Sequence, residues 1–207
     1  MVKILGISGS PRKASTYHAL EIALQAAASK GGVETELISL KGKKIEPCRH
    51  CNYCKKNDSL CCIDDYMKEL YPKIEEADAF IFASPVYLMN ISPHLQALFS
   101  RLRPLHKNKG GSLRDKLAAG IAVGGTRNGG QETTLSAIIH SCLAKGIIFI
   151  GNKPGNYSGA MLWSKDQGAK GVDHDVIGCE SLKNLGNRLA EVALIMGAVR
   201  NSKQADF

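Results

Sequence analysis

Five of the seven cysteines in this chain lie within the fifteen residues from Cys48 to Cys62. Cys48, Cys51 and Cys54 follow one another at C-x2-C-x2-C spacing, and Cys61 and Cys62 come after six more residues. A structural zinc site usually joins two pairs of cysteines that a dozen or more residues hold apart. The compact spacing seen here is instead typical of the ligand sets that surround one iron-sulfur cubane. The loop therefore predicts a metal centre built from thiolates.

A second group of polar residues follows the first apolar run of the chain, in the segment from Gly9 to Tyr17. Hydroxyl groups, a guanidinium and the free amides of a helix start suit a phosphate monoester. The candidate binding residues are Ser10, Arg12, Ser15, Thr16 and Tyr17. Neither the G-x4-G-K-[ST] pattern of nucleoside-triphosphate loops nor the G-x-G-x-x-G turn of dinucleotide binders is present. Taken alone, the same hydroxyls are equally consistent with a simple helix cap.

Two later loops add the other parts of a nucleotide site. A proline-bounded loop offers a surface on which a flat ring can stack, through Pro85, Val86, Tyr87 and Asn90. A glycine-rich loop offers backbone amides and polar donors to the edge of such a ring, through Gly125, Thr126, Arg127 and Asn128. Each loop alone can be a plain connection. Phosphate, stacking and donor groups together predict an FMN site.

The elements that must position these residues alternate between strands and helices. Strands are expected at Val2–Ser8, Val33–Leu40, Ala79–Ala83, Leu117–Val123 and Ile147–Ile150, and helices at Tyr17–Ser29, Asp65–Glu76, Pro93–Arg103, Gln131–Lys145 and Val176–Val199. We expect the stretch 152–171 to be irregular. Five apolar strands separated by helices predict an α/β fold with a doubly wound, five-stranded parallel sheet, in which ligands bind beyond the carboxyl ends of the strands. We expect one flavodoxin-like domain over residues 1–207, with the cysteine loop at 41–64 inserted after strand 2.

Composition sets the remaining expectations. The chain carries 27 basic and 19 acidic side chains, a formal charge of +8. The basic residues are scattered with few aromatics among them, so we expect no nucleic-acid partner. No apolar run approaches the roughly eighteen residues of a membrane span, so we also expect no membrane association. The odd cysteine count and a chain that opens directly into a strand favour a reduced, cytoplasmic protein over a secreted one.

Taken together, these motifs resemble the archaeal iron-sulfur flavoproteins, within the wider NADPH-dependent FMN reductase and flavodoxin-like group. The resemblance rests on the cysteine loop and on the segments 6–12, 84–87, 124–132 and 163–166. It implies FMN and one [4Fe-4S] cluster as cofactors, with Cys48, Cys51, Cys54 and Cys61 as the cluster ligands. The doublet departs from the family pattern and leaves Cys62 as an alternative fourth ligand, although the spacing to Ile63 and Met67 favours Cys61.

The resemblance also implies an activity. Such a protein takes single electrons from ferredoxin and passes them through FMN to an acceptor such as O2 or H2O2, and it forms a homodimer or homotetramer. No catalytic acid or base is expected, because the cofactors carry the chemistry. Basic residues flank the cysteines and can attract an acidic ferredoxin, although a solvated loop would have the same composition. They are Lys41, Lys43, Lys44, Arg49, Lys55 and Lys56.

Two other functions remain open on the sequence. The first is an NAD(P)H-dependent FMN or quinone reductase whose cysteine loop is structural or binds zinc. The second is a redox-sensing or metal-sensing binding protein that uses the cluster as a signal and turns over no donor.

Overall fold

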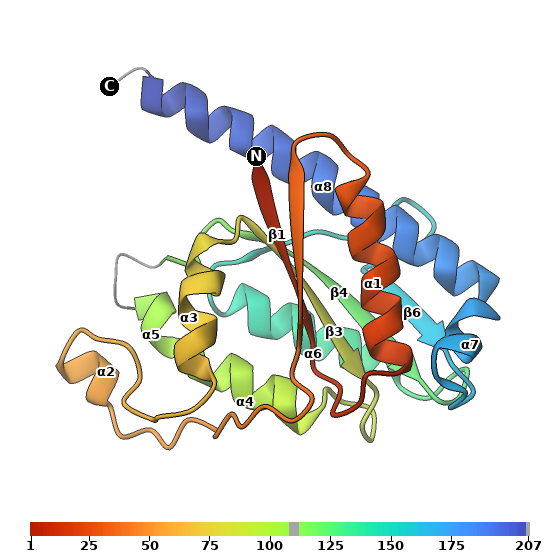
Figure 1. Ribbon diagram of the computed structural model, residues 1–207, viewed down its shortest axis with the longest axis horizontal. Coiled ribbons are helices and arrows are strands. Elements are labelled where there is room, and N and C mark those ends of the chain that lie inside the picture. Colours follow the sequence, from red (N-terminus) through yellow and green to blue (C-terminus); the bar gives the residue numbers. More distant parts are fainter. Residues whose placement is uncertain (108–111, 206–207) are drawn as a thin grey trace.

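The protein folds around a parallel sheet with helices on both faces (Figure 1). The computed structural model describes residues 1–107 and 112–205. The strand order is β2-β1-β3-β4-β5, formed by β2 (Val33–Ser39), β1 (Val2–Ser8), β3 (Ala79–Pro85), β4 (Leu117–Gly124) and β5 (Ile148–Phe149), and β6 (Ala160–Trp163) also pairs with β4. This order, with its reversal between β1 and β3, is the flavodoxin-like order predicted from the sequence.

The fifth position of the sheet is shared by two short strands. Ile148 lies opposite Leu117 at the start of β4, whereas β6 pairs with the last residues of β4, from Ile121 to Gly124. The expectation that 152–171 is irregular was therefore wrong, because the stretch contains β6 and helix α7 (Gly168–Asp173). The physical reason is not local: β5 covers only the first part of β4, and β6 satisfies the backbone groups that β5 leaves unpaired.

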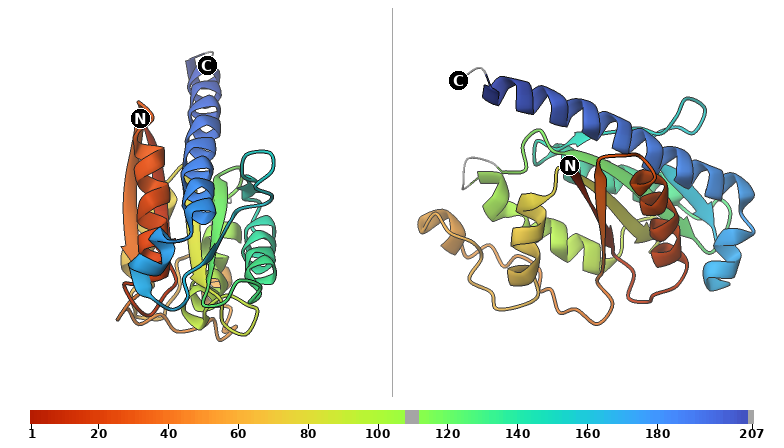
Figure 2. Two further views of the ribbon diagram at one scale, coloured as in Figure 1. Left: turned by 90° about the vertical axis from the view of Figure 1, so that its right-hand side faces the viewer. Right: turned by 45° about the horizontal axis from the view of Figure 1, so that its top comes forward.

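Each face of the sheet has its own apolar core. On one face, α1 (Ser15–Ala28) and α8 (Val176–Ala205) pack over the sheet. The opposite face is covered by α3 (Met67–Glu76), α4 (Pro93–Arg101), α5 (Arg103–Lys107) and α6 (Gln131–Leu143). Figure 2 shows the sheet between the two layers and the end of α8 extending past it.

The predicted helix Pro93–Arg103 is divided at Leu102 into α4 and α5. Pro104 accounts for the break, because proline has no amide hydrogen to continue the hydrogen bonds of α4 and is tolerated only in the first turn of a helix, where it stands in α5. The turn at Leu102 directs Ser100, Arg101 and Arg103 toward the cysteine loop, as their hydrogen bonds to Cys48, Glu46 and Asn52 show.

The segment 41–64 leaves the carboxyl end of β2 and returns to the sheet through α3. It contains one short helix, α2 (Tyr53–Lys56), and its first half runs along α4 (Figure 1). Among the described helices, none combines the length and the apolar character that crossing a membrane requires.

Candidate functional site

The loops that follow β1, β3, β4 and β6 meet beyond the carboxyl ends of these strands. They enclose a cavity of about 100 Å³. Its lining comprises Ser10, Arg12, Ala14, Ser15, Thr16, Pro85, Val86, Tyr87, Val123, Gly125, Ser164 and Asp166. Pockets for whole ligands usually measure about 300–1,000 Å³. The enclosed space therefore suits the phosphate end of a nucleotide, and a flat ring would have to lie outside it.

The structure places only some of the candidate FMN residues around this cavity. Those that line it are Ser10, Arg12, Ser15, Thr16, Pro85, Val86, Tyr87 and Gly125. Those that lie outside its lining are Tyr17, Asn90, Thr126, Arg127 and Asn128. Ser164 and Asp166 line it too, although sequence reasoning did not assign them.

The amino end of α1 forms the polar end of the cavity. Ala14 occupies the N-cap position and no side chain caps the helix, so the first amides of α1 are available to an anion. The Ser10 hydroxyl accepts a hydrogen bond from the Arg12 amide at 3.1 Å and thereby shapes the loop. Ser10 and Thr16 are both buried. The helix-cap alternative has no support at Ala14, and the arrangement suits phosphate.

The loop after β3 is a tight turn that presents an aromatic ring. The backbones of Tyr87 and Asn90 exchange two hydrogen bonds, of 2.8 and 2.9 Å, and Leu88 and Met89 between them have φ angles of 47° and 63°. Such left-handed pairs are typical of two-residue turns. The Asn90 side chain accepts a bond from the Ile91 amide within the same loop. Tyr87 is 41% exposed, so its ring remains free to stack against a ligand.

Gln131, the first residue of α6, holds the glycine-rich loop in shape. Its buried amide donates to the carbonyl oxygens of Thr126, at 2.7 Å, and Leu162, and it accepts from the Gly129 amide at 2.9 Å. A Cβ on Gly124 would lie 2.3 Å from the Gln131 side-chain nitrogen, so any other residue there would displace this amide from its hydrogen bonds. The sequence signal for this role was a glutamine directly after a glycine-rich loop.

The segment after β6 completes the site. The Trp163 indole donates to the Gly125 carbonyl at 3.0 Å, and the Arg127 guanidinium lies 5.0 Å from the centre of the Trp163 ring. Arg127 is thus engaged with an aromatic ring outside the cavity. The Asp166 carboxylate lies against Gly125, where a Cβ would meet it at 2.5 Å. Trp163 therefore fixes the position of the backbone that lines the cavity.

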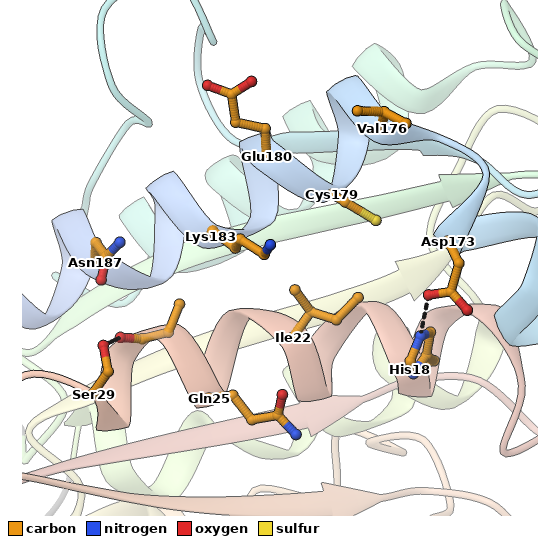
Figure 3. Close-up of a pocket in the computed structure, with 11 residues that line it drawn as sticks. His18, Ile22, Gln25, Ser29, Asp173, Val176, Cys179, Glu180, Lys183 and Asn187 are labelled. Atoms are coloured by element: carbon orange, nitrogen blue, oxygen red, sulfur yellow. Dashed lines mark hydrogen bonds and ion pairs between the residues drawn. The ribbon is translucent and has the colours of Figure 1, made fainter.

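A larger cavity, of about 770 Å³, lies between α1, α7 and α8. Figure 3 shows its lining, including the contact of 2.7 Å between His18 and Asp173. This cavity is a groove between helices, and none of its lining residues comes from the end of a strand. We place the candidate site at the strand ends instead, because ligands of open parallel sheets bind there.

The cysteine loop is open in this structure. Cys51 and Cys62 are exposed, and Cys48, Cys54 and Cys61 are half-buried. Within the described residues, no three His, Cys, Asp or Glu side chains are grouped so as to hold a metal ion. The donor types nevertheless suit an iron-sulfur cluster, since thiolates are its usual ligands.

Two thiols of this loop, those of Cys51 and Cys62, already interact. A hydrogen bond from the Tyr53 amide lowers the pKa of Cys51, and the side chain of Cys62 contributes in the same direction. Cys61, in contrast, packs against the core beside α3. The structure thus brings Cys62 next to Cys51.

Comparison with known proteins matches residues 2–153 to the family described as NADPH-dependent FMN reductase. An iron-sulfur flavoprotein of Methanocaldococcus jannaschii is 41% identical over 197 residues, covering 94% of this chain and 99% of its own. Another, from Methanosarcina thermophila, is 35% identical over 191 residues, covering 92% and 95%. A WrbA-like flavodoxin from Agrobacterium tumefaciens has the same fold, with a TM-score of 0.66 at 16% identity over 93% of this chain and 98% of its own. The fold and the family predicted from the sequence are confirmed: the chain belongs to the NADPH-dependent FMN reductase family, among the iron-sulfur flavoproteins.

Proposed function

We propose that this protein is an electron-transfer oxidoreductase that binds FMN and one [4Fe-4S] cluster. The cluster accepts single electrons, and the flavin can hold two and deliver them to an acceptor such as O2 or H2O2. One observation carries the proposal. The cysteine loop leaves the sheet at the carboxyl end of β2, on the same edge as the cavity formed by the loops after β1, β3, β4 and β6.

The FMN part of the proposal rests on the polar end of that cavity. We assign the phosphate to the amides at the start of α1, with Ser10, Arg12, Ser15 and Thr16 around it. Tyr87 is the stacking residue, and the Gly125 backbone forms part of the cavity wall. We retain Tyr17, Asn90, Thr126, Arg127 and Asn128 only as candidates for contact with the parts of FMN that lie outside the cavity.

For the cluster we propose Cys48, Cys51, Cys54 and Cys61 as ligands. Most of the loop between the cysteines is exposed, so Cys48, Cys51 and Cys54 can gather around a cluster without disturbing either core, whereas Cys61 packs against one core. Because Cys62 contacts Cys51, it is the competing fourth ligand. Cys61→Ser and Cys62→Ser variants separate the two, since only the variant that lacks a true ligand loses iron.

An anaerobic absorption spectrum of the purified protein is the first test, combined with analysis of iron, sulfide, zinc and released flavin. We expect FMN together with about four irons and four sulfides per chain. Flavin with zinc, or with no metal, would contradict the proposal.

The electron donor we propose is an acidic ferredoxin that docks on the lysines of the cysteine loop. Lys43, Lys44 and Lys55 are all exposed, although Lys44 also pairs with Glu46 at 2.9 Å. Attraction between such a surface and an acidic partner speeds association mainly at low ionic strength. Changing these three lysines to Glu should slow reduction by ferredoxin at low salt, with a smaller effect at high salt.

The control for this experiment carries the same charge change elsewhere. Lys153, Lys170 and Lys183 are exposed and belong to the region of α7 and α8, on the other side of the sheet. Equal slowing by both triple variants would show that only net charge matters and would remove the docking surface from the proposal.

A second candidate function is an NAD(P)H-dependent FMN or quinone reductase, which the match to the reductase family favours. It predicts flavin reduction by NADPH under anaerobic conditions without ferredoxin. Flavin that stays oxidised with NADPH and becomes reduced with ferredoxin would reject this candidate.

We further propose that the protein works in the cytoplasm, where its thiols stay reduced. A homodimer or homotetramer is the proposed assembly, in which the cluster of one subunit can approach the flavin of another. Light scattering of the loaded protein measures the assembly directly, and a monomeric mass would contradict it.

A further inference from the structure

A buried ion pair joins the two ends of the cysteine loop. The Arg101 and Asp65 side chains are 1% and 0% exposed, and the two distances between their polar atoms are 2.7 and 3.2 Å. Arg101 projects from the last turn of α4, whereas Asp65 follows the last cysteines of the loop. Neither residue lies at the strand-end cavity, so the site described above does not explain why a charge pair is buried here.

Both partners also bind the backbone at the start of the loop. The Asp65 carboxylate accepts a hydrogen bond from the Glu46 amide at 2.9 Å, and Arg101 donates to the Glu46 carbonyl at 2.8 Å. The same carboxylate accepts from the Met67 amide at 3.0 Å, at the start of α3. Residues on both sides of the cysteines, at positions 46 and 65–67, are therefore tied to one guanidinium and one carboxylate.

The neighbours of Arg101 add two further attachments to the loop. The Ser100 hydroxyl accepts a hydrogen bond from the Cys48 amide at 3.0 Å. Arg103 donates to the Asn52 side chain at 2.8 Å, between Cys51 and Cys54. The junction of α4 and α5 thus contacts the loop before the first cysteine, at that cysteine and between the next two.

The other end of α4 is attached to the carboxyl edge of the sheet, where the proposed FMN cavity lies. Ser92, the N-cap of α4, donates from its hydroxyl to the Gly9 carbonyl at 2.6 Å, and its amide donates to the Ser84 hydroxyl at 2.9 Å. Gly9 follows β1 and Ser84 lies near the end of β3. At about 1.5 Å per residue, the nine residues of α4 form a rigid spacer of ~13 Å between the two loops.

We propose that Arg101 is a positioning residue for the iron-sulfur cluster, which it serves by clamping both ends of the cysteine loop to α4 through Asp65. The clamp fixes both ends of the loop, and α4 sets the distance from the loop to the edge of the sheet at which the cavity lies. This inference rests on the proposed function, because it concerns the cluster that the loop would hold.

The test compares Arg101→Lys with Arg188→Lys, a control at an exposed arginine of α8. Lysine keeps the buried positive charge but cannot bridge Asp65 and the Glu46 carbonyl at once, because it lacks the planar fork of arginine. Circular dichroism and FMN content verify that each variant is folded. If Arg101→Lys fails to fold, Ser100→Ala provides the same comparison at the Cys48 amide.

Two measurements then test whether Arg101 clamps the loop and whether the clamp positions the cluster. Arg101→Lys removes the bond from the charged guanidinium to the Glu46 carbonyl, which helps to hold this residue against Asp65. In cluster-free protein, the loss of such a bond should speed hydrogen exchange of the Glu46 amide by at least about tenfold. In loaded protein, it should speed the loss of iron to a chelator several-fold, while Arg188→Lys matches the wild type in both experiments.

Unchanged exchange at Glu46 would overturn the clamp, and faster exchange with unchanged iron loss would overturn its role in positioning the cluster. A wild-type protein that holds no iron would fail the proposed function instead. That case is recognisable, because the exchange of Glu46 would still respond to Arg101→Lys.

Discussion

Gly186 lies in α8 where this helix crosses α1, and replacing it with alanine sets two effects against each other. A Cβ at this position would lie 2.1 Å from the Ala23 carbonyl oxygen and 3.2 Å from the Ala27 amide nitrogen. Ordinary contacts of a Cβ begin near 3.4 Å, so the two helices would have to separate by roughly 1 Å. The obstacle is backbone, which cannot move aside as a side chain can.

Two opposing free energies decide whether Gly186→Ala stabilises or destabilises the protein. Alanine in place of glycine stabilises a helix interior by about 1 kcal/mol, whereas overpacking costs about 1–3 kcal/mol. Because the obstacle is backbone, the overpacking cost lies in the upper part of this range, at about 2–3 kcal/mol, so we expect Gly186→Ala to lower the free energy of unfolding by about 1–2 kcal/mol. For a chain of this length, that lowers the melting temperature by about 2–8 °C.

Gly197, in the same helix, is the matched control. A Cβ there would meet only a methyl group of Val2, at 3.2 Å. Gly197→Ala should therefore keep most of the helix gain and be neutral or stabilising by up to about 1 kcal/mol. Urea unfolding followed by circular dichroism measures both variants, with equal slopes verifying that the midpoints report stability. Equal or greater stability of Gly186→Ala would refute the reasoning.

Four more outcomes follow from single residues. Lys116 is buried and donates to three carbonyl groups at the end of α3, so Lys116→Met should lower the free energy of unfolding by about 1–3 kcal/mol, seen as a lower urea midpoint; an unchanged midpoint would contradict this. Gln131→Leu removes the bonds that shape the glycine-rich loop and should raise the FMN dissociation constant about tenfold, measured by fluorescence titration against the wild type. Burial raises the pKa of Cys142 to about 12, so in cluster-free protein at pH 8 iodoacetamide should label Cys51, whose pKa is lowered, and leave Cys142 unlabelled on mass-spectrometric mapping. Burial raises the pKa of Asp65, but the ion pair with Arg101 and the hydrogen bonds from two backbone amides outweigh burial, so the pKa in the folded protein is lowered. The ionised Asp65 therefore stabilises the fold above the unfolded pKa near 4, and this stabilisation is lost as the pH falls through the folded pKa. Acid titrations of the wild type and Asp65→Asn should converge below this window, and parallel curves would contradict the assignment.

Much of this protein was predictable because its chemistry-bearing residues directly follow apolar strands. The run from Val2 to Ser8 is buried at nearly every position, and the polar loop after it must emerge at the carboxyl edge of the sheet. The spacing from Cys48 to Cys54 is likewise a local property, so sequence alone was enough to predict a metal-binding loop. Order of elements, fold and family all follow from such local patterns.

The tertiary structure decided the contacts between residues far apart in the chain. Strand β6 forms because β4 offers it an unpaired edge, which no pattern within Ala160–Trp163 reveals. Asp166 reaches Gly125, and Arg101 reaches Asp65, only because the strand order brings their loops together. Side chains of these types are ordinary on a surface, and burial in a particular topology is what gives them a partner and a role.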